Sequence, residues 1–241
     1  MEILVTAGNT QVPIDRVRCL TNVFTGRTGA AIALAAHGRG HGVTLLTSHP
    51  DTVRNASGVA VETYRTFDDL QDLMAQHIAP GKLNAVLHCA AVSDYHADGI
   101  FAPRAGTRFH NEDQTWHATA GAPALDDRSA GKVKSDEPEL WLRLVRAPKL
   151  IDRIRSDWKF RGLLVKFKLE VGLSDEELLN VAEHSRSQSA ADLMVANTLE
   201  GAADCAWLGP LDGAYQRIAR PELPRRLLEE IEARHKEAMH G

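Results

Sequence analysis

The chain has 241 residues, 44% of them hydrophobic and 25% charged, which is enough apolar material for one large α/β domain or two small ones. Its formal net charge of -4 argues against broad nucleic-acid binding, so we expect no nucleic-acid partner. No apolar run reaches the roughly 18 residues of a membrane span, and residues 1–6 begin a strand rather than a signal peptide. We therefore expect no membrane contact. The three widely spaced cysteines lack a C-x-x-C pair, which indicates a reducing compartment and a cytoplasmic location.

Strands and helices alternate along the chain. The expected elements, in order, are strand 2–6, helix 27–37, strand 42–47, strand 59–63, helix 67–78, strand 84–89, strand 139–145, helix 148–157, strand 162–168, helix 174–190, strand 192–196, a hairpin of 205–208 and 214–218, and helix 222–238. Short apolar runs such as Ala85-Val86-Leu87 suit strands that are buried on both faces. This alternation implies right-handed βαβ units, a mainly parallel sheet, and ligands that bind beyond the carboxyl ends of its strands.

Segment 95–138 interrupts the alternation. It is rich in glycine, proline and polar residues, and Trp116 is its lone large anchor. We expect a long irregular loop here, because a structureless segment of this length is typical of a lid, a partner-binding arm or a disordered region.

The first thirty residues suggest a site for phosphate. The apolar strand Ile3-Leu4-Val5-Thr6 runs into the small residues of 7–10, and residues 21–29 lead into an alanine-rich helix. Backbone N–H groups and the helix dipole both favour an anion where a strand passes through such a loop into a helix. The loop is too long, and its glycines are wrongly spaced, for a dinucleotide fingerprint or a P-loop.

Three further loops follow predicted strands, at 90–94, 167–171 and 196–198. Ala90 and Ala91 would let a ligand approach the backbone closely. Asp94 could accept hydrogen bonds from a ligand hydroxyl or amide, or lie near a metal, but it suits a helix cap or turn equally well.

A few polar and aromatic side chains each have two interpretations. The Asn22 amide can both donate and accept, which suits a developing oxyanion, although asparagine also forms turns. Lys132 and Lys134 close the long loop, where they could neutralise a polyphosphate or simply be solvated. Phe167 at a strand end could stack on a base or belong to the core.

Several catalytic signatures are missing from the sequence. No Tyr-x-x-x-Lys and no Gly-x-Ser-x-Gly occur, which argues against a short-chain reductase and a hydrolase elbow. His37 and His41 have the spacing of a metal pair, but Gly38-Arg39-Gly40 between them indicates a helix end and a loop, so we expect no metal held by the protein alone.

An ordered set of short motifs runs along nearly the whole chain. Its pieces are Leu4-Val5-Thr6-Ala7-Gly8-Asn9-Thr10, Pro13-Ile14-Asp15, Val17-Arg18, Thr21-Asn22 with Gly26 and Gly29, Ala90-Ala91-Val92-Ser93-Asp94-Tyr95, Lys132-Val133-Lys134, Pro148-Lys149-Leu150-Ile151, Phe167-Lys168-Leu169-Glu170 and Val195-Ala196-Asn197. Each piece alone is weakly specific, but the ordered set resembles the phosphopantothenate–cysteine ligase family, also called phosphopantothenoylcysteine synthetases.

The resemblance implies a ligase of coenzyme A biosynthesis. A nucleoside triphosphate would activate the carboxylate of 4'-phosphopantothenate as an acyl-nucleotide with loss of pyrophosphate, and the amine of cysteine would then form the amide. The family implies a homodimer and a Rossmann-like, three-layer α/β fold with a long flap loop and a C-terminal hairpin and helix. A single domain is expected over residues 1–241, with the flap at about 95–138. ATP, or CTP, would be the co-substrate, and Mg2+ would be carried mainly by the triphosphate.

The resemblance also implies roles for individual residues. Asn22 would stabilise the acyl-nucleotide and bind the pantothenate moiety, and Lys132 would contact the triphosphate. The residues expected around the nucleotide are Gly8, Asn9, Gly26, Gly29, Pro148, Lys149, Leu150, Ile151, Phe167 and Asn197. Those expected around the pantothenate arm are Asn22, Ala90, Ala91 and Asp94.

The sequence departs from the family pattern at three places. Asn9 replaces the second glycine of a Gly-Gly pair, and Phe24-Thr25-Gly26 replaces Ser-Ser-Gly. Residues 185–191 lack the lysines that bacterial two-domain members carry there, so the chain looks closer to the stand-alone, ATP-using members. The alternatives are a ligase for a different acid or amine, a non-catalytic nucleotide-binding paralogue and a nicotinamide-dependent reductase.

Overall fold

The computed structural model describes residues 1–53 and 58–240, which divide into two compact units. The first unit comprises residues 1–10, 23–92 and 149–241, and the second comprises residues 11–22 and 93–148. Whether the two units make up the single domain expected over residues 1–241 stays a prediction.

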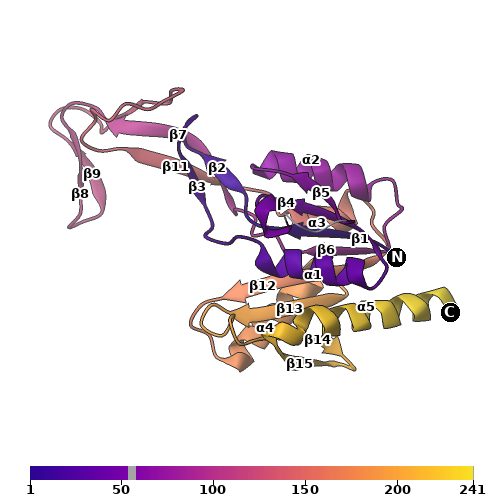
Figure 1. Cartoon of the computed structure of the whole chain (residues 1–241). Coiled ribbons are helices and arrows are strands. Elements are labelled where there is room, and N and C mark those ends of the chain that lie inside the picture. The colour runs from indigo at the N-terminus through magenta and orange to yellow at the C-terminus, as the bar shows by residue number, and fades with distance from the viewer. Residues whose placement is uncertain (54–57, 241) are drawn as a thin grey trace. The chain divides into compact units, whose positions relative to one another are not determined.

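The first unit is built on an eight-stranded sheet (Figure 1) of order β15-β14-β13-β12-β6-β1-β4-β5. Its strands are β1 (Glu2–Ala7), β4 (Gly42–Thr47), β5 (Ala60–Thr63), β6 (Ala85–His88), β12 (Leu163–Glu170), β13 (Leu193–Thr198), β14 (Cys205–Leu211) and β15 (Ala214–Ala219). Neighbouring strands from β5 to β13 are parallel, whereas β14 and β15 pair antiparallel. The carboxyl ends of the central strands therefore meet at one edge.

Helices cover both faces of this sheet. They are α1 (Arg27–Gly38), α2 (Phe67–Ile78), α3 (Leu150–Ser156), α4 (Asp175–Gln188) and α5 (Leu223–His240), with the short 3-10 helices η1 (Pro50–Val53) and η2 (Arg220–Glu222). Buried residues of α1 and α5 share one core with Val195 of β13. The preceding residue of β13, Met194, instead packs with Leu178 and Ala182 of α4. Because successive strand residues face opposite sides, α1 and α5 lie on one face and α4 on the other.

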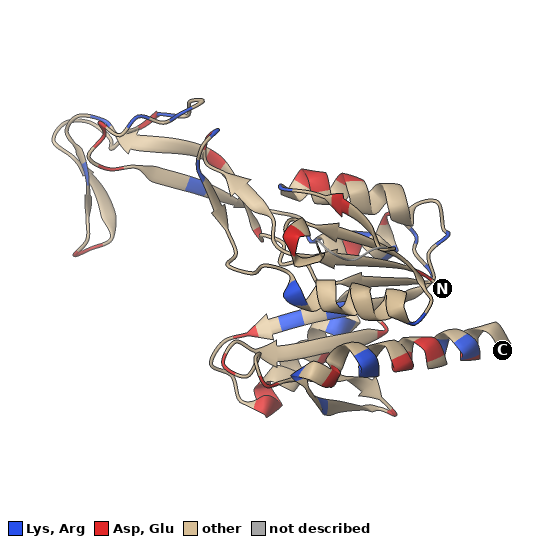
Figure 2. Cartoon of the chain, viewed as in Figure 1, with Lys and Arg blue, Asp and Glu red and all other residues tan. Residues whose placement is uncertain are grey.

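Local signals in the sequence explain where two of these helices begin. Thr66 and Asp69 form a reciprocal capping box at the start of α2, and Ser174 and Glu177 form one at the start of α4. Acidic and basic residues are intermixed on the exposed side of α5 (Figure 2), whereas its buried leucines, such as Leu227, face the core.

The predicted α/β fold is confirmed, with element bounds that agree to within a few residues. None of the helices within residues 1–53 and 58–240 has both the length and the apolar character that a bilayer span requires.

The second unit contains small antiparallel sheets. The hairpin of β2 (Gln11–Pro13) and β3 (Cys19–Thr21) is one, the three-stranded sheet β10-β7-β11 is another, and the hairpin of β8 and β9 is the third. The remaining bounds are β7 (Tyr95–Pro103), β8 (Thr107–His110), β9 (Thr115–Ala118), β10 (Leu125–Asp127) and β11 (Trp141–Arg146).

The expectation of an irregular loop over 95–138 was wrong, because four strands form there. Gly106, Gly121 and Pro123 lie between short antiparallel strands, and the strand expected at 139–145 pairs with β7 instead of joining the large sheet. Trp116 is also not a lone anchor. Its ring packs on those of Phe109 and Trp141 with centroid separations of 5.2 and 4.7 Å, respectively.

Candidate functional site

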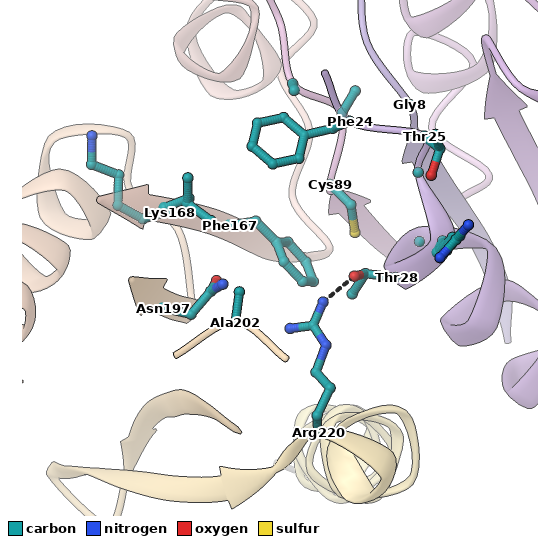
Figure 3. Close-up of a pocket in the computed structure, with 16 residues that line it drawn as sticks. Gly8, Phe24, Thr25, Thr28, Cys89, Phe167, Lys168, Asn197, Ala202 and Arg220 are labelled. Carbon is teal, nitrogen blue, oxygen red and sulfur yellow. Dashed lines mark hydrogen bonds between the residues drawn. The ribbon is translucent and has the colours of Figure 1, made fainter. Parts of the chain in front are cut away.

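A cavity of about 300 Å3 lies within the first unit, at the carboxyl ends of β1, β6, β12 and β13 and at the first turn of α1 (Figure 3). The residues that line it are Gly8, Phe24, Thr25, Gly26, Arg27, Thr28, Gly29, Cys89, Ala90, Ala91, Phe167, Lys168, Leu169, Asn197, Ala202 and Arg220. This is the edge at which open parallel sheets bind their ligands.

Two glycines let the β1 loop and the start of α1 meet backbone to backbone. Gly8 and Gly26 have φ angles of 90° and 78°, in the left-handed region that glycine adopts most readily. A Cβ atom on Gly26 would lie 2.3 Å from the backbone nitrogen of Gly8. No other residue fits at this position without moving the loop.

The first turn of α1 lines the cavity. Gly26 is the N-cap and supplies no side-chain acceptor, and the first turn has no acidic residue. The first N–H groups of a helix have no partners inside the helix, and the dipole adds partial positive charge there. Since Arg27, Thr28 and Gly29 line the cavity, this end of it suits an anion.

A buried polar pair supports the loop after β6. The Thr6 hydroxyl accepts a hydrogen bond from the Ala90 N–H at 3.1 Å and lies 3.0 Å from Nδ1 of His88. Burial, assisted by the positive charge of Lys166, lowers the pKa of His88 to about 4. A neutral His88 and Thr6 therefore hold the Ala90–Ala91 backbone at the cavity wall.

Arg220 enters the cavity from η2. Its guanidinium donates a hydrogen bond to the hydroxyl of Thr28 in the first turn of α1 (Figure 3). Burial lowers the pKa of Arg220 and raises the pKa of the neighbouring Cys89 thiol well above its usual range. Cys89 therefore remains a neutral thiol and is poorly suited to act as a nucleophile.

Phe167 and Asn197 lie in the carboxyl-terminal halves of adjacent strands, β12 and β13. Figure 3 shows both beside Ala202, with the Phe167 ring above the Arg220 guanidinium. The Phe167 ring also packs against the hydrophobic core. Its predicted place in the core is therefore confirmed, and the stacking of a base on this ring stays a prediction. The amino group of Lys168 pairs with Glu170 at 2.8 Å.

The structure brings most of the predicted strand-end residues of the first unit together. Those that line the cavity are Gly8, Gly26, Gly29, Ala90, Ala91, Phe167 and Asn197. Asn9 lies beside it but bonds to the neighbouring loop instead: its backbone N–H donates to Ser48 Oγ at 2.9 Å, and the Ser48 hydroxyl donates to Asn9 Oδ1 at 3.1 Å.

Other predicted residues lie elsewhere. Lys149 is the N-cap of α3, and Leu150 and Ile151 are buried in its first turn; none of these lines the cavity. The second unit holds the rest, namely Asn22, Asp94, Lys132 and Pro148.

Within the second unit, the backbone carbonyl of Asp94 accepts a hydrogen bond from Ala147 at 2.8 Å. Val133 is buried, and the exposed residues Lys132 and Lys134 flank it. The two lysines therefore occupy an anchored segment instead of a free loop.

Sequence reasoning missed Arg220, Thr28 and Cys89. The local sequence Ala219-Arg220-Pro221 contains no binding motif, and only the return of the chain from β15 toward α5 carries the arginine to the cavity. Thr28 lies within the predicted phosphate-type loop and helix start, so a search for hydroxyl groups there would have found it.

The fold and cavity define a Rossmann-like α/β protein with a strand-end site suited to an anionic ligand. Residues 1–105 match the family described as DNA/pantothenate metabolism flavoprotein C-terminal domain. The chain is 32% identical over 238 residues to the coenzyme A biosynthesis bifunctional protein CoaBC of Thermococcus kodakarensis, covering 95% of this chain and 50% of that protein. It is 27% identical over 244 residues to CoaBC of Mycobacterium tuberculosis, covering 95% of this chain and 51% of that protein.

Solved structures of other proteins are similar to this chain in fold. A DNA/pantothenate metabolism flavoprotein from Streptococcus pneumoniae is 25% identical, with a TM-score of 0.77 and coverage of 98% of this chain and 100% of that one. A Cab2 mutant in complex with phosphopantothenate-cysteine is 16% identical and shares the fold, with a TM-score of 0.68 and coverage of 98% and 86%. The chain is thus similar to the CoaBC proteins and spans about half their length. These findings confirm the resemblance drawn from the motifs.

Proposed function

We propose that the chain is a nucleotide-dependent ligase that joins 4'-phosphopantothenate and cysteine in coenzyme A biosynthesis. The observation that carries the proposal is the convergence of the family-like motifs of β1, β6, β12 and β13 on one cavity beside the open N-terminus of α1. The relatives named for coenzyme A biosynthesis and the Cab2 complex with phosphopantothenate-cysteine support it.

The reaction requires positioning and charge neutralisation more than a dedicated nucleophile. A carboxylate oxygen of the acid would attack the α-phosphorus of the nucleotide and displace pyrophosphate, and the cysteine amine would then attack the acyl carbon and release the nucleoside monophosphate. The first-turn N–H groups of α1 suit phosphate oxygens, and Phe167 suits a base. Cys89, a neutral thiol, has no part in this scheme.

The family resemblance implies further roles for residues of the second unit. In this proposal Asn22 stabilises the acyl-nucleotide, Asp94 holds the pantothenate arm, and Lys132 neutralises the leaving pyrophosphate. ATP is the proposed nucleotide and CTP the alternative, Mg2+ would be carried by the triphosphate, and a homodimer in the cytoplasm is part of the same proposal.

Phe24 favours a second candidate, a related ligase for another acid or amine. It lines the cavity at a position where the family pattern has a small hydroxyl residue, so the space near the phosphates differs from that pattern.

The test is pyrophosphate release by the whole chain with Mg2+, 4'-phosphopantothenate and cysteine, with ATP and CTP supplied in separate reactions. Release with ATP that depends on 4'-phosphopantothenate would support the ligase and its nucleotide. Release with CTP alone would support the ligase and contradict the choice of ATP. Absence of release with both nucleotides, in a folded protein, would contradict the proposal and direct attention to other acids and amines.

A further inference from the structure

Arg220 is held firmly at the cavity wall from both ends. Its backbone N–H donates to the carbonyl of Asp204 at 2.8 Å, which fixes the start of η2. Its guanidinium reaches across the cavity to the Thr28 hydroxyl in the first turn of α1 (Figure 3). The charged group is thus oriented before any ligand arrives.

Among the residues that the structure describes, no carboxylate forms an ion pair with Arg220. The titratable groups whose charge affects its pKa are the thiols of Cys89 and Cys205. Burial lowers the pKa of Arg220, but an arginine side chain stays protonated at any physiological pH. A half-buried cation without a counter-charge is costly, so the site favours the arrival of an anion.

Two other partly buried arginines, Arg155 and Arg234, differ from Arg220 because each has an acidic partner. Arg155 pairs with Asp192 at 2.7 Å and also donates to three backbone carbonyls. Arg234 pairs with Glu230 at 2.6 Å and donates to two backbone carbonyls. Both are fully engaged in holding the fold together. Arg220 has the same five N–H donors but makes one side-chain hydrogen bond within the described residues.

The geometry points to Arg220 as a phosphoryl-binding residue that acts together with the first-turn N–H groups of α1. Thr28 orients the guanidinium toward this helix end, and the neutral Cys89 thiol does not compete for the charge. A planar guanidinium binds phosphate oxygens in a bidentate manner. The identity of the phosphoryl group rests on the proposed function, which supplies two sources: the triphosphate of the nucleotide and the phosphomonoester of 4'-phosphopantothenate.

The first experiment measures binding by titration calorimetry, without turnover, for ATP, inorganic tripolyphosphate and 4'-phosphopantothenate in separate titrations. Arg220→Gln should weaken the ligand whose phosphate it holds by about 10- to 100-fold, and Arg220→Lys should weaken it less. Arg226→Gln is the matched control, because Arg226 is a nearby arginine that does not line the cavity. Weakening confined to ATP and tripolyphosphate identifies the nucleotide, and weakening confined to 4'-phosphopantothenate identifies the acid.

The Thr28→Val variant distinguishes a structural role of the Arg220–Thr28 contact from direct ligand binding by Arg220, because it removes the hydroxyl but keeps the guanidinium. This variant should bind more tightly than Arg220→Gln does. Equal losses in the two variants, or unchanged affinities in Arg220→Gln, would overturn the assignment of Arg220. Tripolyphosphate binding that depends on Arg220 in a protein without ligase turnover would support the assignment of Arg220 while contradicting the proposed function.

The wild-type protein supplies a test that needs no folded variant. Phenylglyoxal modifies accessible arginines, and peptide mass spectrometry reports the extent of labelling at each one. Saturating tripolyphosphate or 4'-phosphopantothenate should protect Arg220 while leaving Arg226 labelled. Equal labelling of Arg220 with and without both ligands would overturn the proposal.

Discussion

The carboxylate of Asp15 accepts a hydrogen bond from the backbone N–H of Val133 at 3.0 Å, across 118 positions of the chain. Arg18 completes the contact, since it pairs with Asp15 at 2.6 Å and donates to the Val133 carbonyl at 2.8 Å. Hydrogen bonds from Arg18 and from backbone N–H groups hold the pKa of Asp15 well below its usual range. The turn between β2 and β3 thereby fixes the segment that carries Lys132.

Asp15→Asn should loosen this segment. The variant removes the charge that Arg18 and the Val133 N–H both bind, so the chain around Lys132 and Lys134 should open more often. We expect several-fold faster tryptic cleavage after these two lysines, measured by mass spectrometry over a time course. Asp98→Asn is the control, because Asp98 forms an exposed pair with Arg143 in the same unit. Cleavage at the wild-type rate would show that Asp15 does not hold the segment.

Loss of turnover is the outcome expected for Asn22→Ala and Lys132→Ala. Each removes a group that the proposed mechanism uses to stabilise developing charge, and kcat should fall by at least about 100-fold. Urea unfolding should stay within error of wild type, because both side chains are exposed. Lys82→Ala, which removes an exposed lysine from the first unit, should retain full turnover. Normal turnover in either site variant would contradict its assigned role.

The large sheet could be predicted from the sequence because its strands are short apolar runs set between clear helical segments. Of the strands that the structure describes in the second unit, only β11 was predicted. Its strands β8 and β9 are short and mostly polar, each with one large aromatic residue, and their stability comes from contacts across the sheet, such as the packing of Phe109 on Trp116. Glycine-rich and proline-rich composition alone does not separate such turns from an irregular loop.

The candidate site, like the fold, could be predicted from the sequence only in part. Residues directly after buried strands, such as Gly8 and Ala90, were predicted because parallel strands end at one edge. Asn9 fits the same rule, yet its side chain bonds to Ser48 of the neighbouring loop, a partner that only the strand order reveals. Arg220 follows an antiparallel strand, where the rule does not apply.

Gly26→Ala should destabilise the first unit more than Gly40→Ala does. Both glycines have φ angles in the left-handed region, 78° and 86°, so each alanine costs about 1–2 kcal/mol of backbone strain. A Cβ atom at Gly40 meets nothing within 4 Å, whereas one at Gly26 would overlap the Gly8 backbone. We expect an additional loss of about 1–3 kcal/mol at Gly26, measured by urea unfolding. Equal losses of unfolding free energy at both positions would show that the loop around Gly8 moves to accommodate the new Cβ atom without destabilising the protein.

The neutral state of His88 predicts a pH dependence of stability. The pKa of His88 is about 4 in the folded protein, below the ordinary histidine value of 6.5, because the ring is buried near Lys166. Between these two pH values the unfolded chain binds more protons than the folded one, so stability falls as the pH drops through this window. From pH 7 to pH 5 this residue should account for a loss of roughly 2 kcal/mol.

The measurement is urea unfolding of wild type and His88→Gln at pH 7 and pH 5, a range that lies above the titration of most carboxylates. Wild type should lose roughly 2 kcal/mol more than His88→Gln over this range, because glutamine has no proton to gain. His184→Gln, which replaces an exposed histidine, should follow the wild-type dependence. An NMR titration of the wild-type ring gives an independent reading: a His88 signal that titrates near pH 6.5 would show that burial does not hold this imidazole neutral, and the Thr6–Ala90 support would then need another explanation.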